Sequence, residues 1–288
     1  MARTPRAVAL GRALRQEREA RGFSLREFAG MISRDEPTLS RWETGDRVPS
    51  AEQLGRVLGT LGVAEERFSG IMMLVRDAKA PSWVAFDETE RQWQRRAYVD
   101  FEQEAAAITL ISLLRIPDLL QTPTTIAAAQ RARGVAERMI PEQVEAVVGR
   151  RERLTVGHEA PAVTAFIGDS AVRQSFGEPR AALAQLGHLV DMARRPNVSL
   201  RIVPSGFDAH PDLHAESTLL DCRQLRIVVT GCLPSPVWVH RPEHVRSYRG
   251  LADDLTAAAL SEVDSIGFIS HLAHWHRSRI GPLVPVRE

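Results

Sequence analysis

The chain has 288 residues, of which 44% are hydrophobic and 25% are charged, and its formal net charge at pH 7 is +1. These values lie close to the averages for globular proteins, so they exclude a disordered chain and a fibrous repeat. At roughly one domain per 150 residues, the length predicts two domains. No apolar run approaches the roughly 20 residues that cross a bilayer, and the arginine-bearing N-terminus lacks the apolar core of a secretory signal. We therefore expect a cytoplasmic protein without a membrane partner.

Charge and cysteine usage narrow the function further. Residues 1–76 hold 13 arginines against 10 acidic residues, and Lys79 is the only lysine of the chain. Arginine binds phosphate bidentately, so even a small excess matters if it gathers on one face. Cys222 and Cys232 both lie in apolar, strand-like runs, which excludes a disulfide scaffold and predicts two core residues.

The first seventy residues predict four or five short helices. Leu10 and Leu14 have helical spacing, and Gly22 is placed to end the first helix. In "SLREFAGM" a serine is followed by a glutamate three residues later, a capping box that begins a second helix. Its Ala29 would let another helix cross closely. A second box, "SAEQ" from Ser50, opens a helix with a stripe of leucine and valine.

The third helix of this region is predicted over residues 36–44. Asp35 can cap its first turn, Pro37 is tolerated because its position needs no N–H donor, and Gly45 closes it. The order of these caps and small residues carries a resemblance. The segment "LGRALRQEREARGFSLREFAGMISRDEPTLSRWETGDRVPSAEQLGRVLGTLGV" resembles the helix-turn-helix domain of lambda-repressor-like transcription factors of the xenobiotic-response-element class. The turn position that usually holds glycine is here Ser33.

The resemblance implies that helix 36–44 lies in the major groove of DNA. By matching positions it implies base contacts from Glu36, Pro37 and Arg41, and phosphate contacts from Arg26, Thr38, Ser40 and Arg47. The chemistry agrees in part, because arginine pairs with guanine O6 and N7 and glutamate accepts from cytosine N4. The resemblance also implies that Leu39 and Trp42 pack inward and that Glu43 pairs with Arg18. The alternative is a protein-binding helical module with a solvated arginine face.

The rest of the chain predicts a larger mixed domain. Residues 77–94 form the expected linker and residues 95–288 the second domain, so the fold class is α+β, with an all-α N-terminal domain and a mixed α/β effector domain. Helical patterns cover 91–115, 125–134, 141–157, 178–195, 242–260 and 262–276. Apolar, β-branched runs predict strands at 162–168, 198–204, 216–222, 225–231 and 236–240. We expect a small sheet that is covered on at least one face.

A second resemblance covers most of residues 95–276. "FEQEAAAITLISLLRIPDLLQTP", "RRERLT", "AFIGDSAVRQSFGEPRAALAQLGHLVDMARRPNVSLRIVPSGFDAHP" and "SEVDSI" resemble the C-terminal domain of actinobacterial WhiJ-like, antitoxin-like regulators. The resemblance implies a regulator whose second domain senses a small molecule or docks a partner, often a small acidic protein. Its motifs are mostly packing motifs.

The sequence signals for a ligand pocket, a metal site or an enzyme activity in the second domain are weaker. His210, His214 and Trp238 lie near strand ends and loops and are the candidates for a ligand pocket. These two histidines with His240, His244, His271, His274 and His276 could be imagined as a metal site, but no Cys-x-x-Cys or HExxH motif accompanies them. We predict no metal, no cofactor and no enzyme activity, because no nucleophile motif or phosphate loop occurs. An enzyme would require ionisable groups such as Asp208, His210 and Asp212 to gather around a ligand.

Two functions follow as hypotheses. The first is a homodimeric, sequence-specific DNA-binding transcriptional regulator whose larger domain senses a small molecule or partner protein. The alternative is an antitoxin-like adaptor that restrains a small protein encoded nearby and uses DNA binding for autoregulation. The expected partners are double-stranded DNA, a second copy of the chain, and an effector or a small acidic protein.

Overall fold

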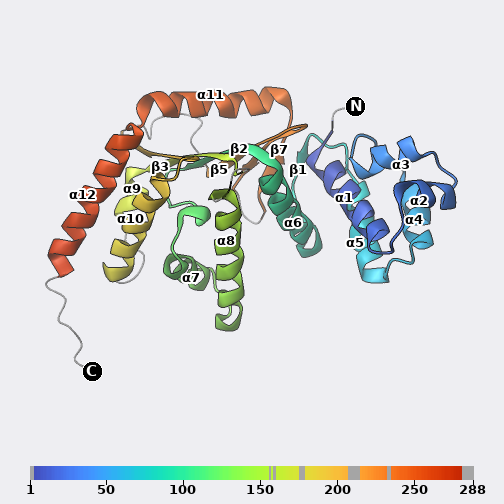
Figure 1. Cartoon of the computed structure of the whole chain (residues 1–288), viewed down its shortest axis with the longest axis horizontal. Helices are drawn as coiled ribbons and strands as arrows, with labels where there is room; N and C mark the ends of the chain where they lie inside the picture. Colours follow the sequence, from blue (N-terminus) through green and yellow to red (C-terminus); the bar gives the residue numbers. More distant parts are fainter. Residues whose placement is uncertain are drawn as a thin grey trace. The chain divides into compact units, whose positions relative to one another are not determined.

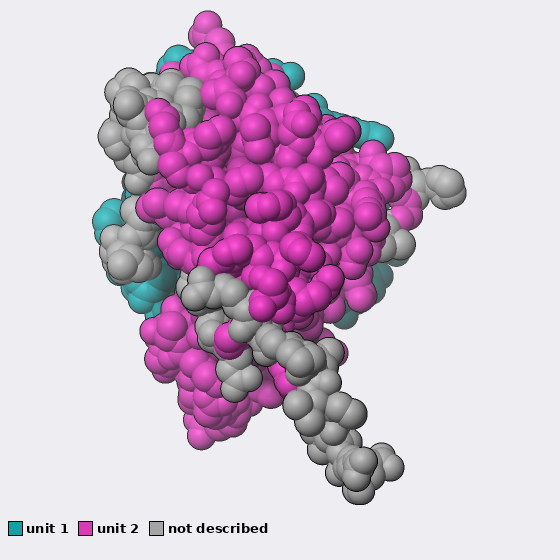
Figure 2. All heavy atoms as spheres, turned by 90° about the vertical axis from the view of Figure 1, so that its left-hand side faces the viewer, with its two compact units in different colours: residues 1–101, 222–245 teal, residues 102–221, 246–288 magenta. Residues whose placement is uncertain are grey.

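The computed structural model describes residues 3–155, 157, 160–174, 179–206, 215–231 and 235–280. The chain forms two compact units, which Figure 2 shows in different colours. Unit 1 comprises residues 1–101 and 222–245, and unit 2 comprises residues 102–221 and 246–288. None of the described helices is long and apolar enough to cross a membrane.

Five short helices open unit 1, as the capping pattern predicts (Figure 1). They are α1 Pro5–Glu19, α2 Leu25–Met31, α3 Glu36–Glu43, α4 Ala51–Thr60 and α5 Glu65–Val75. Both predicted capping boxes are formed: the Ser24 hydroxyl accepts from the Glu27 N–H at 3.2 Å, and the Ser50 hydroxyl accepts from the Gln53 N–H at 3.1 Å. Each box satisfies two N–H groups that a helix start leaves unpaired, so the polar sequence signals fix where these helices begin.

The core of these helices is built around α1. Leu10 and Leu14 are 1% exposed, and Leu39, Leu54 and Leu58 from α3 and α4 are fully buried. The stripe predicted in α4 is therefore its inner face. This packing supplies the stability that helices of this length lack in isolation.

Residues 77–104, which include the expected linker, hold defined structure, and all but the last three belong to unit 1. They contain β1 Ser82–Trp83 and α6 Glu88–Glu104. Trp83 is 1% exposed, and the buried Glu90 of α6 forms an ion pair with the buried Arg6 of α1. The Arg67 guanidinium of α5 lies 4.7 Å from the ring centre of Trp93. The compact unit therefore extends beyond residue 76, because α1 and α5 pack against α6.

Two further strands, β6 Arg226–Thr230 and β7 Val237–Val239, belong to unit 1. β7 pairs antiparallel with β1 and with β6, and Trp83 lies opposite Trp238 in the register. Both strands fall inside the predicted spans. Cys222, expected in the core, is only half-buried at the end of its strand and donates to the Phe101 carbonyl at 3.3 Å, while Cys232 lies outside the described residues.

The helical pattern predicted over 91–115 is wrong in its second half, where Ala105–Ser112 form strand β2. β2 pairs in parallel with β3, and Ile108 and Ile111 are at most 1% exposed. A strand that is buried on both faces reads as a continuous apolar run, and such a run resembles the buried side of a helix. The two β-branched isoleucines and Thr109 favour the strand.

Unit 2 is a mixed α/β structure. Its strands are β2, β3 Ala162–Gly168, β4 Val198–Val203 and β5 Ser217–Cys222, whose last residue is assigned to unit 1. The helices are α7 Pro123–Ala132, α8 Ile140–Thr155, α9 Asp169–Arg173, α10 Pro179–Ala193, α11 Pro242–Ala258 and α12 Glu262–Ile280, with short 3-10 turns at Asp118–Leu120 and Glu137–Met139. β3 pairs in parallel with both β2 and β4.

Helices cover both faces of the strands of unit 2. Figure 1 shows α11 on one side and α8 and α10 on the other. The outer strand β4 is closed by the segment before α12, because the Ile202 carbonyl accepts from the Leu260 N–H at 2.9 Å and the Ile202 N–H donates to the Ser265 hydroxyl at 2.9 Å. At the end of α6, Glu102 accepts two 2.8 Å hydrogen bonds from Arg150 of α8. The predicted mixed fold and its covered sheet are confirmed.

Candidate nucleic-acid interface

The turn between α2 and α3 is tight and has one strained residue. Ser33, where the resembling family usually has glycine, adopts the left-handed conformation with φ of 51°. A side chain there costs more than glycine, so the surrounding contacts must hold the turn. One such contact is the hydrogen bond from the Arg34 N–H to the carbonyl of Ala29, at 2.9 Å. Ala29 is 2% exposed, and its small side chain suits the close crossing of α2 and α3.

Asp35 fixes the start of α3. Its carboxylate accepts from the Thr38 N–H at 2.6 Å, and Pro37 occupies the first turn, where no N–H donor is needed. The hydrogen bond from Thr38 holds the pKa of Asp35 below its usual value. A carboxyl group with a lowered pKa stabilises the fold above its unfolded-state pKa and loses that contribution as the pH falls through the folded-state pKa. The cap is therefore complete at neutral pH.

The inner face of α3 is anchored to α1. Leu39 is fully buried and Trp42 is 3% exposed, as expected. The Glu43 carboxylate accepts hydrogen bonds from Arg18 Nε at 2.6 Å and from Arg18 Nη2 at 2.8 Å, so the pair is bidentate. Hydrogen bonding to Glu43 raises the pKa of Arg18. The pairing implied by the resemblance is confirmed. Arg18 also donates to the carbonyl of Phe23 at 2.7 Å, so one guanidinium group ties together α1, the following loop and α3.

The outer face of α3 is free to meet another molecule. Glu36, Pro37 and Arg41 are exposed on α3, and Arg41 donates from Nε to the Pro37 carbonyl at 3.0 Å. This bond orients the guanidinium along the helix and leaves its two Nη groups for a partner. Thr38 and Ser40 are half-buried at the edges of this face.

Arginines of the N-terminal helices divide into two groups. Eight of them have carboxylate partners: Arg3, Arg6, Arg12, Arg15, Arg18, Arg21, Arg56 and Arg67. The second group, without such a partner in the described structure, includes Arg76 after α5 and four arginines near α2 and α3. Across the described part of the chain, no carboxylate lies within ion-pair distance of the exposed Arg26, Arg34, Arg41 and Arg47. These four flank or lie on α2 and α3. A group of exposed cations that form no direct ion pair is a suitable surface for a polyanion.

Sequence reasoning missed Arg34 as a member of this surface, and it gave no role to Lys79. Arg34 sits in the tight turn, two residues before α3, and Lys79 follows α5. The signal for Arg34 was its position directly before the cap Asp35. The one sequence signal for Lys79 was that it is the single lysine of the chain, and the residues around it are set by tertiary packing.

Of the residues predicted to form a ligand pocket, only Trp238 lies in the described part of the chain. His210 and His214, with Asp208 and Asp212, lie outside the described residues. Trp238 is 1% exposed and packs in unit 1, with ring centres 5.3 Å from Trp83 and 6.0 Å from Phe101. It is a core residue of that cluster. The pocket assigned to these residues stays a prediction.

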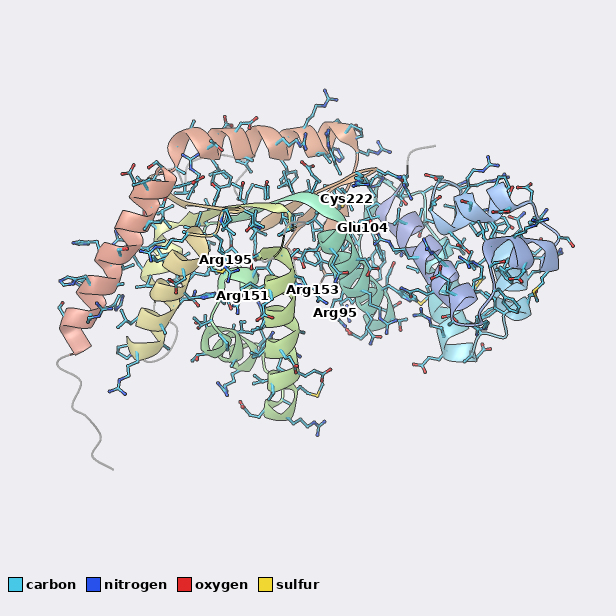
Figure 3. All side chains as sticks on the ribbon, in the orientation of Figure 1. Arg95, Glu104, Arg151, Arg153, Arg195 and Cys222 are labelled. Carbon is cyan, nitrogen blue, oxygen red and sulfur yellow. The ribbon has the colours of Figure 1, made fainter. Side chains whose placement is uncertain are left out.

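Histidines of the C-terminal helix are spread along α12. His271 and His274 are exposed and His276 packs edge-on against Trp275, with ring centres 4.9 Å apart. Within the described ranges, no group of three or more His, Cys, Asp or Glu residues is arranged to hold a metal ion. Around α8 and α10, Arg151 and Arg195 serve local structure: Arg151 donates to the Gln121 carbonyl at 2.8 Å, and Arg195 to the Thr155 carbonyl at 3.1 Å (Figure 3).

Comparison with known families agrees with this arrangement. A family model described as a helix-turn-helix domain matches residues 9–68, which cover most of α1, all of α2 to α4 and about the first turn of α5. A second model, described as a domain of unknown function (DUF5753), matches residues 95–271. No curated protein matches the chain. The N-terminal helices thus form a helix-turn-helix domain, and the chain belongs to the DUF5753 family.

Proposed function

We propose that this protein is a sequence-specific DNA-binding transcriptional regulator. In this proposal α3 enters the major groove, Glu36, Pro37 and Arg41 meet base edges, and phosphates are contacted by Arg26, Thr38, Ser40 and Arg47. The observation that carries it is the group of four exposed arginines on or beside α2 and α3, because no carboxylate of the described residues lies within ion-pair distance of any of them. If these arginines only covered the surface of a helical module, acidic partners like those of the other arginines would be expected to stabilise them.

The rigid support of α3 is the second argument. A helix that reads bases must be held in a fixed position, because each contact depends on short distances. The bidentate Arg18–Glu43 pair, the Asp35 cap and the buried Leu39 hold three successive turns of the α3 region. The residues proposed to meet DNA lie on the opposite, exposed side.

The division of labour along the chain is part of the proposal. Residues 1–76 bind DNA, residues 77–94 connect the parts, and residues 95–288 act as the effector domain that receives a small molecule or a partner protein. The resemblance to WhiJ-like, antitoxin-like regulators supports this assignment. We also propose that the chain binds as a homodimer, because one recognition helix reads only a short half-site.

The polar end of β2 favours an effector role for the second domain. Ligands of parallel α/β sheets bind beyond the carboxyl ends of the strands. There Arg115 donates from Nε to Glu216 at 2.6 Å, and Ser112 donates to the same carboxylate at 3.3 Å. Asp169 begins α9 at the end of the neighbouring β3. These groups lie where an effector would approach.

A selection experiment tests the DNA-binding function. Full-length protein would be mixed with random-sequence duplexes, and the bound DNA would be recovered and sequenced. We expect an enriched inverted repeat whose half-sites lie about 10 base pairs apart, or a multiple of that spacing. An enriched single half-site would contradict the homodimer, and a failure to enrich any sequence would contradict sequence-specific binding.

Arg41→Ala is expected to relax the selected sequence at one base pair of each half-site. A bidentate arginine–guanine pair contributes about 1–3 kcal/mol of discrimination, so the preference for that base pair should fall by about 5-fold to 150-fold. The measurement is competition between the selected duplex and a duplex with that base pair changed. Arg15→Ala is the matched control, since Arg15 is an exposed arginine of α1 paired with Glu19 at 2.7 Å. An unchanged preference in Arg41→Ala would remove the proposed base contact.

A further inference from the structure

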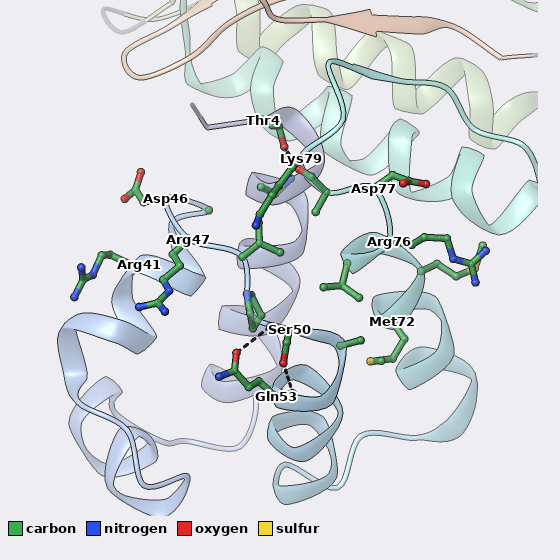
Figure 4. A pocket seen from close by; sticks show the side chains of 18 of the residues that line it. Thr4, Arg41, Asp46, Arg47, Ser50, Gln53, Met72, Arg76, Asp77 and Lys79 are labelled. Carbon is green, nitrogen blue, oxygen red and sulfur yellow. Dashed lines mark hydrogen bonds between the residues drawn. The ribbon is translucent and has the colours of Figure 1, made fainter. Parts of the chain in front are cut away.

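A groove of about 1170 Å³ lies beside the C-terminal end of α3 in unit 1 (Figure 4). The loop between α3 and α4, the start of α4, the end of α5 and residues 76–79 line it. Its inner surface is largely apolar, with half-buried Val48, Met72 and Met73. Four exposed cations line it, and we take three of them, Arg41, Arg47 and Lys79, as its rim.

The backbone around Lys79 is held firmly. The buried hydroxyl of Thr4 donates to the Ala78 carbonyl and also accepts from the Ala7 N–H, which caps α1. Asp77 adopts a left-handed conformation with φ of 53°, and the Ala80 N–H closes the turn on the Asp77 carbonyl at 2.8 Å. Lys79 is therefore fixed relative to α1, the helix that also holds α3.

The acidic residues of the groove do not neutralise these cations. Asp46 lies 3.6 Å from Arg3 and accepts from the Thr44 hydroxyl at 2.6 Å. Figure 4 shows the carboxylates of Asp46 and Asp77 directed away from Lys79. In the described residues no carboxylate is within ion-pair distance of Lys79, Arg47 or Arg41. The rim is thus a positively charged edge beside the outer face of α3.

The cations of this region differ in the direction of their side chains, as Arg76 and Lys79 show. Arg76 is exposed and stands three residues before Lys79. In Figure 4 its guanidinium points away from Arg41 and Arg47, whereas the Lys79 side chain extends into the groove on the side of Arg47. The two residues carry the same charge at similar places in the chain. Of these two residues, Lys79 is the one whose side chain is placed to share a ligand with Arg47.

We infer that Lys79 is a phosphate-contacting residue of the DNA interface, so that the sugar-phosphate backbone beside the base pairs read by α3 lies along the rim from Arg47 to Lys79. This inference rests on the proposed function. Lysine serves as a point charge for phosphate, and each phosphate that a protein neutralises releases condensed counterions. The contact extends the interface beyond the helix-turn-helix helices to the segment after α5. It strengthens binding without reading sequence.

The salt dependence of DNA binding tests Lys79. Fluorescence anisotropy would follow binding of a selected duplex of about 30 base pairs, roughly three helical turns, by wild type, Lys79→Gln, Lys79→Arg and Arg76→Gln. For Lys79→Gln the slope of log K against log salt should fall by about 0.9 per bound chain, which is roughly an eightfold loss of affinity per chain at 0.1 M salt. Lys79→Arg should keep the wild-type slope. Arg76→Gln removes the same charge and should leave the slope nearly unchanged.

The outcomes separate this inference from the proposed function. An unaltered slope in Lys79→Gln, or an equal fall in Lys79→Gln and Arg76→Gln, would overturn the direct contact while the sequence preference tested through Arg41 still stands. Absence of any DNA binding by the wild type would overturn both. Thermal melting of each variant checks folding, and we expect no change because both side chains are exposed.

Discussion

Replacing Glu43 by alanine is expected to lower the free energy of unfolding by about 3–5 kcal/mol. Glu43 is 7% exposed and its partner Arg18 is 6% exposed, so the substitution leaves a buried guanidinium whose remaining carboxylate contact is the 3.4 Å one to the exposed Glu19. Removing one partner of a buried pair is costly because the remaining charge has lost its solvent and its counter-charge. Urea unfolding followed by tryptophan fluorescence would measure the change.

An exposed pair provides the control for Glu43. Glu52 and Arg56 form an ion pair on α4, and their side chains are 74% and 75% exposed. Glu52→Ala should change the free energy of unfolding by less than about 1 kcal/mol, because solvent screens such pairs. The double variant Arg18→Met/Glu43→Leu should recover part of the stability by removing both charges. Equal effects of Glu43→Ala and Glu52→Ala would contradict the role of Glu43 as the anchor of α3.

Gly11→Ala is the second large effect that we expect, because the backbone of α3 lies directly against this glycine of α1. A Cβ atom at Gly11 would stand 2.4 Å from the Glu43 carbonyl oxygen and 2.5 Å from that of Trp42, and both are backbone atoms. The helices must therefore separate. We expect a loss of about 1–3 kcal/mol in stability, although alanine favours helix more than glycine does. Because α3 is displaced, affinity for the selected DNA should fall as well.

Gly59→Ala is the matched control for Gly11→Ala. Gly59 lies in α4, and nothing lies within 4 Å of a Cβ placed there. This variant should be neutral or more stable by up to about 1 kcal/mol, since it only gains helix propensity. Thermal and urea unfolding of both variants, with DNA affinity measured in parallel, would test the comparison. If Gly11→Ala were as stable as Gly59→Ala and bound DNA normally, close packing of α1 on α3 would not be required.

The helical N-terminal region could be predicted because its signals are local. A capping box involves residues three apart, and Ser24, Asp35 and Ser50 each mark a helix start that the structure confirms. Leucine spacing likewise identifies the buried stripe within a single helix. The Arg18–Glu43 pair spans 25 positions and was reached only through resemblance to a family.

Features that depend on tertiary structure were harder to predict. "AAAITLIS" was assigned to a helix because apolar periodicity cannot separate a buried strand from a buried helix face. The pairing of most N-terminal arginines with carboxylates is equally invisible in a sequence, where only the local balance of charge can be counted. The place of Lys79 beside Arg47 depends on a turn held by Thr4, 75 positions earlier. The part of the candidate site that can be read from sequence is therefore α3 itself.

Methylation interference on the selected duplex is the most direct test of the central claim that α3 reads bases in the major groove. Methylation at guanine N7 blocks the atom with which an arginine pairs in that groove. For the wild-type protein, methylation of one guanine in each half-site should prevent binding. Arg41→Ala should bind the methylated and unmethylated duplexes equally at that guanine, while Arg15→Ala should behave like the wild type. Interference that is absent in the wild type, or that persists unchanged in Arg41→Ala, would contradict the assignment of Arg41 as a base-reading residue of α3.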